Sequence, residues 1–140
     1  MFNFTKKPKE NNPGQVLIPV NHPNPPEKHE VDAAYILARH YRCVIEFIVP
    51  IDDFKRRTAD IIMQNNVWEI KTPEGSSKYT IQKQIRRASK QAKNIIIDTR
   101  RTKLKFERIE KQALFEISKR PAVKKVILID KKEKIVEIFK

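Results

Sequence analysis

Short runs of β-branched residues alternate with amphipathic helical stretches, and this alternation constrains the fold more than any other feature of the sequence. Apolar residues at helical spacing predict three helices, at 26–42, 78–93 and 103–120. Runs of Val, Ile and aromatic residues predict six strands, at 43–49, 60–64, 67–71, 94–98, 124–130 and 134–140. This order favours an α/β fold, with a central mixed β-sheet flanked by helices.

The N-terminal part of the chain has a different composition from the rest. Residues 1–27 hold six of the nine prolines, and proline removes backbone donors and fixes φ. We therefore expect an extended arm or linker at 1–27 and one folded domain at 28–140. Residues 15–20 could still add a short edge strand to the sheet. A charged loop is expected at 51–57.

The charge balance points to a polyanionic partner. The net charge is +13, and residues 28–140 carry +12 of it, so the charge belongs to the folded part. Lys and Arg gain free energy by releasing the counterions condensed on nucleic acid. The alternative is a soluble protein from a lysine-rich proteome.

Composition also excludes several classes of protein. Cys43 is the only cysteine, which rules out an internal disulfide and a thiolate zinc site and fits a reducing compartment. No apolar run approaches the roughly 20 residues that span a bilayer, so we expect no membrane partner. With glycine only at Gly14 and Gly75, a Walker loop or dinucleotide fingerprint is absent.

The predicted hairpin carries ionisable residues within its apolar strands. A turn at 65–66 would pair Ile62 with Glu69 and Asp60 with Lys71. Side chains alternate between the two faces of a strand, so one face would be apolar, with Ile61, Met63, Trp68 and Ile70. The other face would bring Asp60, Glu69 and Lys71 together. A register shift of one residue would scatter the apolar set, which supports this pairing.

This cluster suits phosphodiester hydrolysis. Two close carboxylates, Asp60 and Glu69, repel each other unless a cation lies between them. Oxygen ligands suit Mg²⁺ or Mn²⁺, and the backbone carbonyl of Ile70 can complete the set. Lys71 can orient or deprotonate a water, or stabilise negative charge on the phosphorane. Glu30, on the first helix, can reach the same pocket as a metal ligand or a water-positioning group. The alternative is a solvated sheet face with cross-strand ion pairs.

These residues also resemble a known family. Asp60, eight residues, then Glu69-Ile70-Lys71 is similar to the PD-(D/E)XK nuclease signature, with Glu30 in the position of its first-helix acid. The blocks "HEVDAAYILARHYRCVIEFI", "TADIIMQNNVWEIKTP" and "TIQKQIRRASKQAKNIIIDTRR" are closest to the tRNase toxin domains at the C-termini of contact-dependent growth-inhibition proteins. Two features depart from that pattern: Ala59 replaces the proline before the first acid, and the turn is Asn-Asn instead of Asn-Gly.

The resemblance implies a metal-dependent nuclease that acts on tRNA in the cytoplasm, of the host or of a target bacterium. A cognate immunity protein is implied as a partner, and the chain would be an excised toxin domain or a free-standing relative. Cations after the hairpin are candidates for substrate binding beside two polar residues, the full set being Thr72, Lys78, Arg86, Arg87, Lys90 and Gln91. A DNA endonuclease of the same fold and a non-catalytic basic module that binds nucleic acid remain alternatives.

Overall fold

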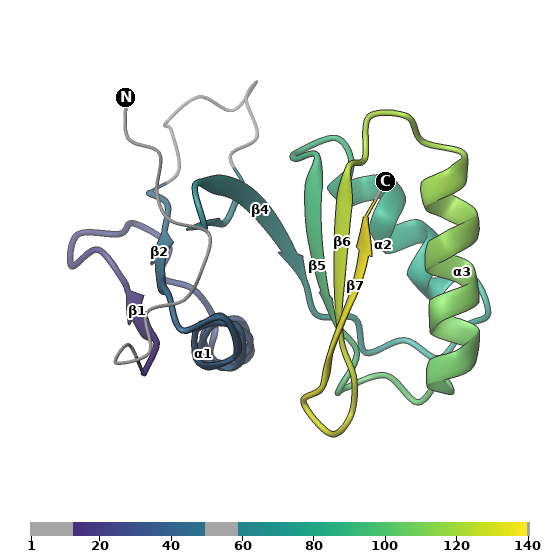
Figure 1. Cartoon of the computed structure of the whole chain (residues 1–140), viewed down its shortest axis with the longest axis horizontal. Coiled ribbons are helices and arrows are strands. Elements are labelled where there is room, and N and C mark those ends of the chain that lie inside the picture. Colours follow the sequence, from purple (N-terminus) through teal and green to yellow (C-terminus); the bar gives the residue numbers. More distant parts are fainter. Residues whose placement is uncertain (1–12, 50–58, 140) are drawn as a thin grey trace.

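The computed structural model describes residues 13–49 and 59–139 (Figure 1). Its three helices are α1 (Lys28–Tyr41), α2 (Thr80–Ala88) and α3 (Phe106–Ser118). Its strands are β1 (Gln15–Leu17), β2 (Val44–Phe47), β3 (Ile61–Met63), β4 (Asn66–Lys71), β5 (Asn94–Asp98), β6 (Lys125–Ile129) and β7 (Ile135–Phe139). The predicted loop at 51–57 lies outside the described residues.

The seven strands form one mixed sheet in sequence order, β1 to β7, which confirms the predicted α/β fold. β1 is parallel to β2, β2–β3–β4 are antiparallel, β4–β5–β6 are parallel, and β7 is antiparallel to β6. β4 therefore joins an N-terminal half, with β1–β3 and α1, to a C-terminal half with β5–β7, α2 and α3. Figure 1 shows β4 passing between these halves.

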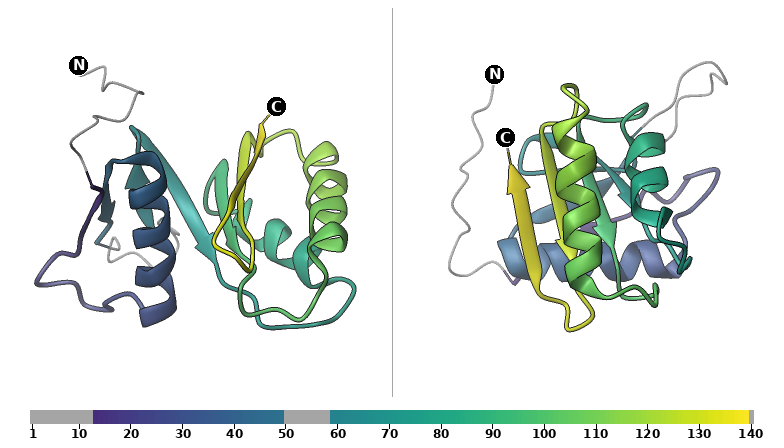
Figure 2. Two further views of the ribbon diagram at one scale, coloured as in Figure 1. Left: turned by 60° about the horizontal axis from the view of Figure 1, so that its bottom comes forward. Right: turned by 90° about the vertical axis from the view of Figure 1, so that its right-hand side faces the viewer.

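Two hydrophobic clusters lie on opposite faces of the sheet. Leu37 of α1 packs in one cluster with Trp68 and Ile96. The other cluster lies between the sheet and α2 and α3, and it includes Ile97 of β5 and Ile109 of α3. Neighbouring residues of β5 thus serve different clusters, because side chains alternate along a strand. Figure 2 shows α2 and α3 on one side of the C-terminal strands. Within the part of the chain that is described, no helix has the length and apolar character needed to cross a membrane.

Part of the proline-rich arm belongs to the sheet. Residues 15–17 pair in parallel with β2, so the short edge strand forms. Gly14 precedes it at φ 93°, and a Cβ there would lie 2.5 Å from the backbone of Ala38 in α1, so only glycine fits. The division at residue 27 stays a prediction.

α2 ends earlier than the periodicity predicts. The expected helix at 78–93 is reduced to Thr80–Ala88. The Ser89 hydroxyl donates to the carbonyl of Arg86 at 2.7 Å, an alternative to continued helix. The chain then turns so that Asn94 can enter the buried strand β5, where its side-chain amide donates to the carbonyl of Val67 at 3.2 Å.

Candidate active site

The β3–β4 hairpin has a register two residues away from the predicted one. Ile61 pairs with Trp68 and Ile62 with Val67, so the predicted turn at 65–66 is wrong. The turn residues are Gln64 and Asn65, both left-handed, with φ 50° and 67°. An indole hydrogen bond favours this register, because Trp68 Nε1 donates to the carbonyl of Met63 at 3.2 Å inside the core.

A shift of two residues leaves each side chain on its predicted face, because the strand repeat is two. The predicted apolar face is buried against α1, as expected, with Ile61, Met63, Trp68 and Ile70. The shift moves Asp60 from opposite Lys71 to beside Glu69. The backbone N–H of Asp60 donates to the carbonyl of Trp68 at 3.0 Å, and its carboxylate accepts from the N–H of Ile70 at 2.8 Å.

Glu69 is a buried carboxylate that is only partly satisfied. The residue is 3% exposed. Its Oε2 lies 3.1 Å from Nζ of Lys71, whereas its Oε1 has no hydrogen-bond partner among the described residues. Lys71 Nζ also donates to Oε1 of Gln91, just after α2, at 3.4 Å. The structure thus brings Asp60, Glu69, Lys71 and Gln91 together.

Burial sets the protonation of the two acids. It raises the pKa of Glu69 to about 7, helped by the nearby charge of Asp60 and opposed by Lys71. Burial also raises the pKa of Asp60, against the lowering effect of the hydrogen bond from Ile70. Both shifts mean that the pair holds two negative charges poorly by itself. A cation bound between the two acids would reduce the free-energy cost of keeping both carboxylates charged.

Glu30 lies in the same cavity as Asp60 but has another partner. A cavity of about 280 Å³ is lined by both residues and by His22 of the arm. The Glu30 carboxylate accepts from the N–H of Glu27 at 2.9 Å, in the capping box that begins α1. His22 donates from Nε2 to the carbonyl of Ile48 at 3.1 Å, which fixes this wall of the cavity. His22 was not predicted as a site residue from the sequence.

No larger cluster of metal-ligand side chains surrounds the pair. Over residues 13–49 and 59–139, no group of three or more His, Cys, Asp or Glu side chains could hold a metal ion. From the described residues, an ion at this place would have two carboxylates and backbone carbonyl oxygen as ligands, besides solvent. That coordination suits Mg²⁺, which usually keeps several waters.

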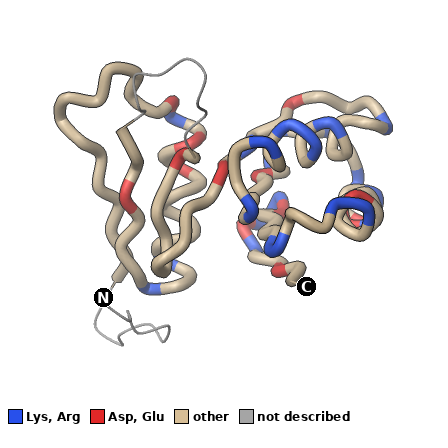
Figure 3. Tube along the Cα trace, turned by 90° about the horizontal axis from the view of Figure 1, so that it is seen from above, with Lys and Arg blue, Asp and Glu red and all other residues tan. Residues whose placement is uncertain are grey.

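The predicted substrate-binding residues lie on α2 and the loops at its ends: Thr72, Lys78, Arg86, Arg87, Lys90 and Gln91. The four cations among them are exposed and form no ion pair with another described residue. Figure 3 shows lysine and arginine concentrated in the half that carries α2 and α3. Of this set, Gln91 contacts Lys71.

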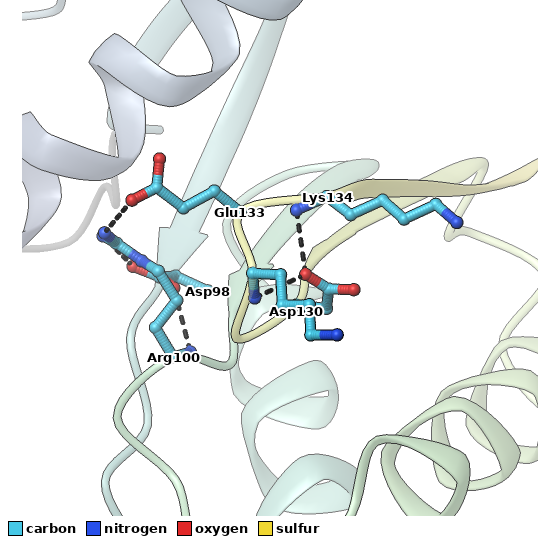
Figure 4. A network of polar contacts seen from close by, with 6 residues as sticks. Asp98, Arg100, Asp130, Glu133 and Lys134 are labelled. Carbon is cyan, nitrogen blue, oxygen red and sulfur yellow. Dashed lines mark hydrogen bonds and ion pairs between the residues drawn. The ribbon is translucent and has the colours of Figure 1, made fainter.

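A second polar network lies at the ends of β5 and β6 (Figure 4). Asp98 is fully buried, and its carboxylate accepts hydrogen bonds from Nε and Nη2 of Arg100 at 2.9 and 2.7 Å. Arg100 also lies 3.9 Å from Glu133 in the β6–β7 turn. The ion pair of Asp98 with Arg100 was not predicted from the sequence. The sequence pattern that could have indicated this pair is an acid at the end of an apolar strand, two residues before an arginine.

Comparisons with known proteins identify the family. Residues 56–135 match the model of the contact-dependent growth inhibition CdiA C-terminal domain. The fold resembles a solved chain from a CdiA-CT/CdiI toxin and immunity complex of Burkholderia pseudomallei, with TM-score 0.59 and 19% identity, covering 91% of this chain and 100% of that one. No curated protein gives a match. The chain therefore belongs to the CdiA C-terminal toxin domain family of contact-dependent growth inhibition.

Proposed function

We propose that this toxin domain is a metal-dependent endonuclease of the PD-(D/E)XK type, which hydrolyses phosphodiester bonds of RNA, with tRNA favoured. One observation carries the proposal. The buried carboxylate of Glu69 has an unpartnered Oε1 and lies beside Asp60, with the ammonium of Lys71 3.1 Å from its other oxygen. A solvated face with surface ion pairs would not bury a half-satisfied carboxylate.

The donor set fits Mg²⁺ or Mn²⁺. Asp60 and Glu69 would hold the ion through carboxylate oxygens, with the carbonyl of Ile70 as a further ligand. When bound, such an ion polarises the phosphate and lowers the pKa of a coordinated water. The unpartnered Oε1 of Glu69 supports this fit, because a buried carboxylate oxygen without a hydrogen-bond donor costs free energy that a bound cation would offset.

The protein's own groups supply position and charge. The side chain of Lys71 is 23% exposed, so its ammonium can reach a phosphate while Glu69 and Gln91 hold it. A cation fixed in this way stabilises negative charge that develops on phosphate oxygens. Glu30, which lines the cavity beside Asp60, would orient a water.

The exposed cations of α2 support a nucleic-acid substrate, because they have no acidic partner in the described part of the chain. We further propose a cognate immunity protein, since the similar structure is a toxin and immunity complex, and action in the bacterial cytoplasm. Lys78, Arg86, Arg87 and Lys90 would contact phosphates, and Thr72 would lie near the scissile bond.

The test is incubation of the pure protein with mixed tRNA or duplex DNA, in Mg²⁺, in Mn²⁺ and in chelator, with fragments sized afterwards. We expect RNA fragments with either metal and none in chelator, and no fragments from Asp60→Asn or Glu69→Gln. Glu46→Gln is the matched control, because Glu46 is an exposed acid on neighbouring β2. Cutting of DNA alone would favour a DNA endonuclease. Binding without cutting in both metals would favour a non-catalytic module.

A further inference from the structure

A second group of cations surrounds a hollow at the start of α3. The hollow has a volume of about 610 Å³ and is lined by Lys103, Leu104, Lys105, Glu107, Arg108 and Lys111. It shares no residue with the cavity at Asp60. Its four cations are exposed, and their side chains form no hydrogen bond or ion pair with the residues that the structure describes.

Neighbouring cations are paired, in contrast. Arg100 is held by Asp98, Arg101 pairs with Glu74, and Lys131 donates to a backbone carbonyl. Asp98 and Glu74 are therefore already engaged. Glu107 is the one acid among the residues that line the hollow, and the four cations outnumber it.

Helix geometry makes the unpaired charges unfavourable. Lys105, Arg108 and Lys111 follow one another at three-residue intervals from the N-cap of α3, so successive cations are neighbours and repel each other. Lys105 and Arg108 are also at the positive end of the helix dipole. A bound polyanion would reduce both the repulsion among the cations and their unfavourable interaction with the helix dipole.

The hollow lies at the same edge of the sheet as Lys71. β4 and β5 are parallel, so the loops that follow them leave from one edge. The two loops are joined, because the Thr102 hydroxyl donates to the carbonyl of Gly75 at 2.5 Å and Arg101 pairs with Glu74. A strand of nucleic acid at Lys71 can therefore continue toward α3.

We propose that this hollow binds the phosphate backbone of the RNA substrate away from the scissile bond. The proposal rests on the proposed nuclease function and adds a binding surface on α3 to the cations of α2. The α3 cations contribute to affinity and do not take part in the chemistry. A polyanion fits better than a small acid, because the four charges are spread around an open hollow.

The test compares two charge-reversal variants with equal changes in net charge. The first is Lys105→Glu/Arg108→Glu/Lys111→Glu. The control is Lys124→Glu/Lys132→Glu/Lys134→Glu, at exposed positions near β6. Single-stranded RNA binding is measured in chelator against salt concentration, and cleavage is measured in Mg²⁺. All these side chains are exposed, and thermal unfolding checks that both variants fold.

We expect the first variant to lower the slope of log Kd against log salt by about 2, since each phosphate contact contributes roughly 0.7. Its KM should rise by about tenfold or more, with kcat within about twofold of wild type. The charge-conserving variant Lys105→Arg/Lys111→Arg should keep the wild-type slope.

Equal slopes in the two charge-reversal variants would overturn the inference, because only net charge would matter. Tighter binding of poly-L-glutamate than of RNA with the same charge would also overturn it, and would assign the hollow to an acidic protein. Failure of the wild type to cleave RNA would instead count against the proposed function, because the salt slope is measured without catalysis.

Discussion

Nζ of Lys71 lies 3.1 Å from Oε2 of Glu69, two positions earlier on the same strand. Residues at this spacing share one face of a strand. The lysine is thus fixed by a carboxylate that is itself buried, and it also donates to Oε1 of Gln91. This arrangement determines what substitutions at each position should do.

Replacing Lys71 with alanine should lower kcat for RNA cleavage by about 10²–10³-fold, because it removes a fixed cation beside the phosphate. RNA affinity should change little, since the exposed cations remain. Single-turnover cleavage and filter binding measure the two quantities. Lys124→Ala, at an exposed position, should leave both unchanged. A loss of affinity equal to the loss of rate would instead make Lys71 a binding residue.

Metal-free stability should fall as the pH rises toward 8. The pKa of Glu69 is about 7 in the fold against an ordinary 4.5, so the folded state binds more protons than the unfolded state between these values. The contribution of this group is therefore complete below about pH 4.5 and is lost as the pH rises through about 7. Thermal unfolding in chelator measures it, and Glu69→Gln should flatten the dependence.

Mg²⁺ should raise Tm more at pH 8 than at pH 6, because protons compete with the ion for Asp60 and Glu69. The same unfolding scans with added Mg²⁺ measure this difference, and Glu69→Gln should reduce it strongly. An equal effect of Mg²⁺ on wild type and Glu69→Gln would show that the ion binds elsewhere.

The β3–β4 turn should be stabilised by Gln64→Asn/Asn65→Gly. Both residues have positive φ, and Asn-Gly is the preferred pair for such a turn. We expect a gain of about 0.5–1 kcal/mol in the free energy of unfolding, measured with urea. Asn66→Gly should lower it by a similar amount, because Asn66 begins β4. The opposite pattern would support a turn at 65–66.

Arg100→Ala should destabilise the fold by about 3–5 kcal/mol, because it leaves the buried carboxylate of Asp98 without its counter-charge, although the backbone N–H of residue 100 still donates to it. Asp98→Asn/Arg100→Ala should recover part of this loss, since no buried charge remains. Urea unfolding at neutral pH compares them with Lys132→Ala, an exposed position in the nearby turn. Equal stability of Arg100→Ala and wild type would mean that another group neutralises Asp98.

The sequence predicted the helices, the sheet and the face of the hairpin that carries the acids, because each depends on local periodicity. The register predicted for that hairpin was wrong, because Asn65 and Asn66 are both residues that favour turns. The observed register is favoured by the hydrogen bond from the indole of Trp68 to the carbonyl of Met63. This bond depends on how the whole core packs. The buried pair Asp98–Arg100 was missed for the same reason.

The candidate site was predicted as a set of residues, and its contacts depend on tertiary structure. Periodicity placed Asp60, Glu69 and Lys71 on one face, whereas the position of Gln91 depends on where α2 ends. The cavity wall at His22 depends on the packing of the arm against β2, and no pattern in the sequence encodes it.

β4 is paired with β3 on one side and β5 on the other. Asp60 comes from the N-terminal half and Gln91 from the C-terminal half, and the strand between them carries Glu69 and Lys71. Neither half alone contains this set of groups. A partly folded chain, in which β4 has found only one neighbour, would therefore be chemically incomplete, and the groups assemble only when both halves have folded together.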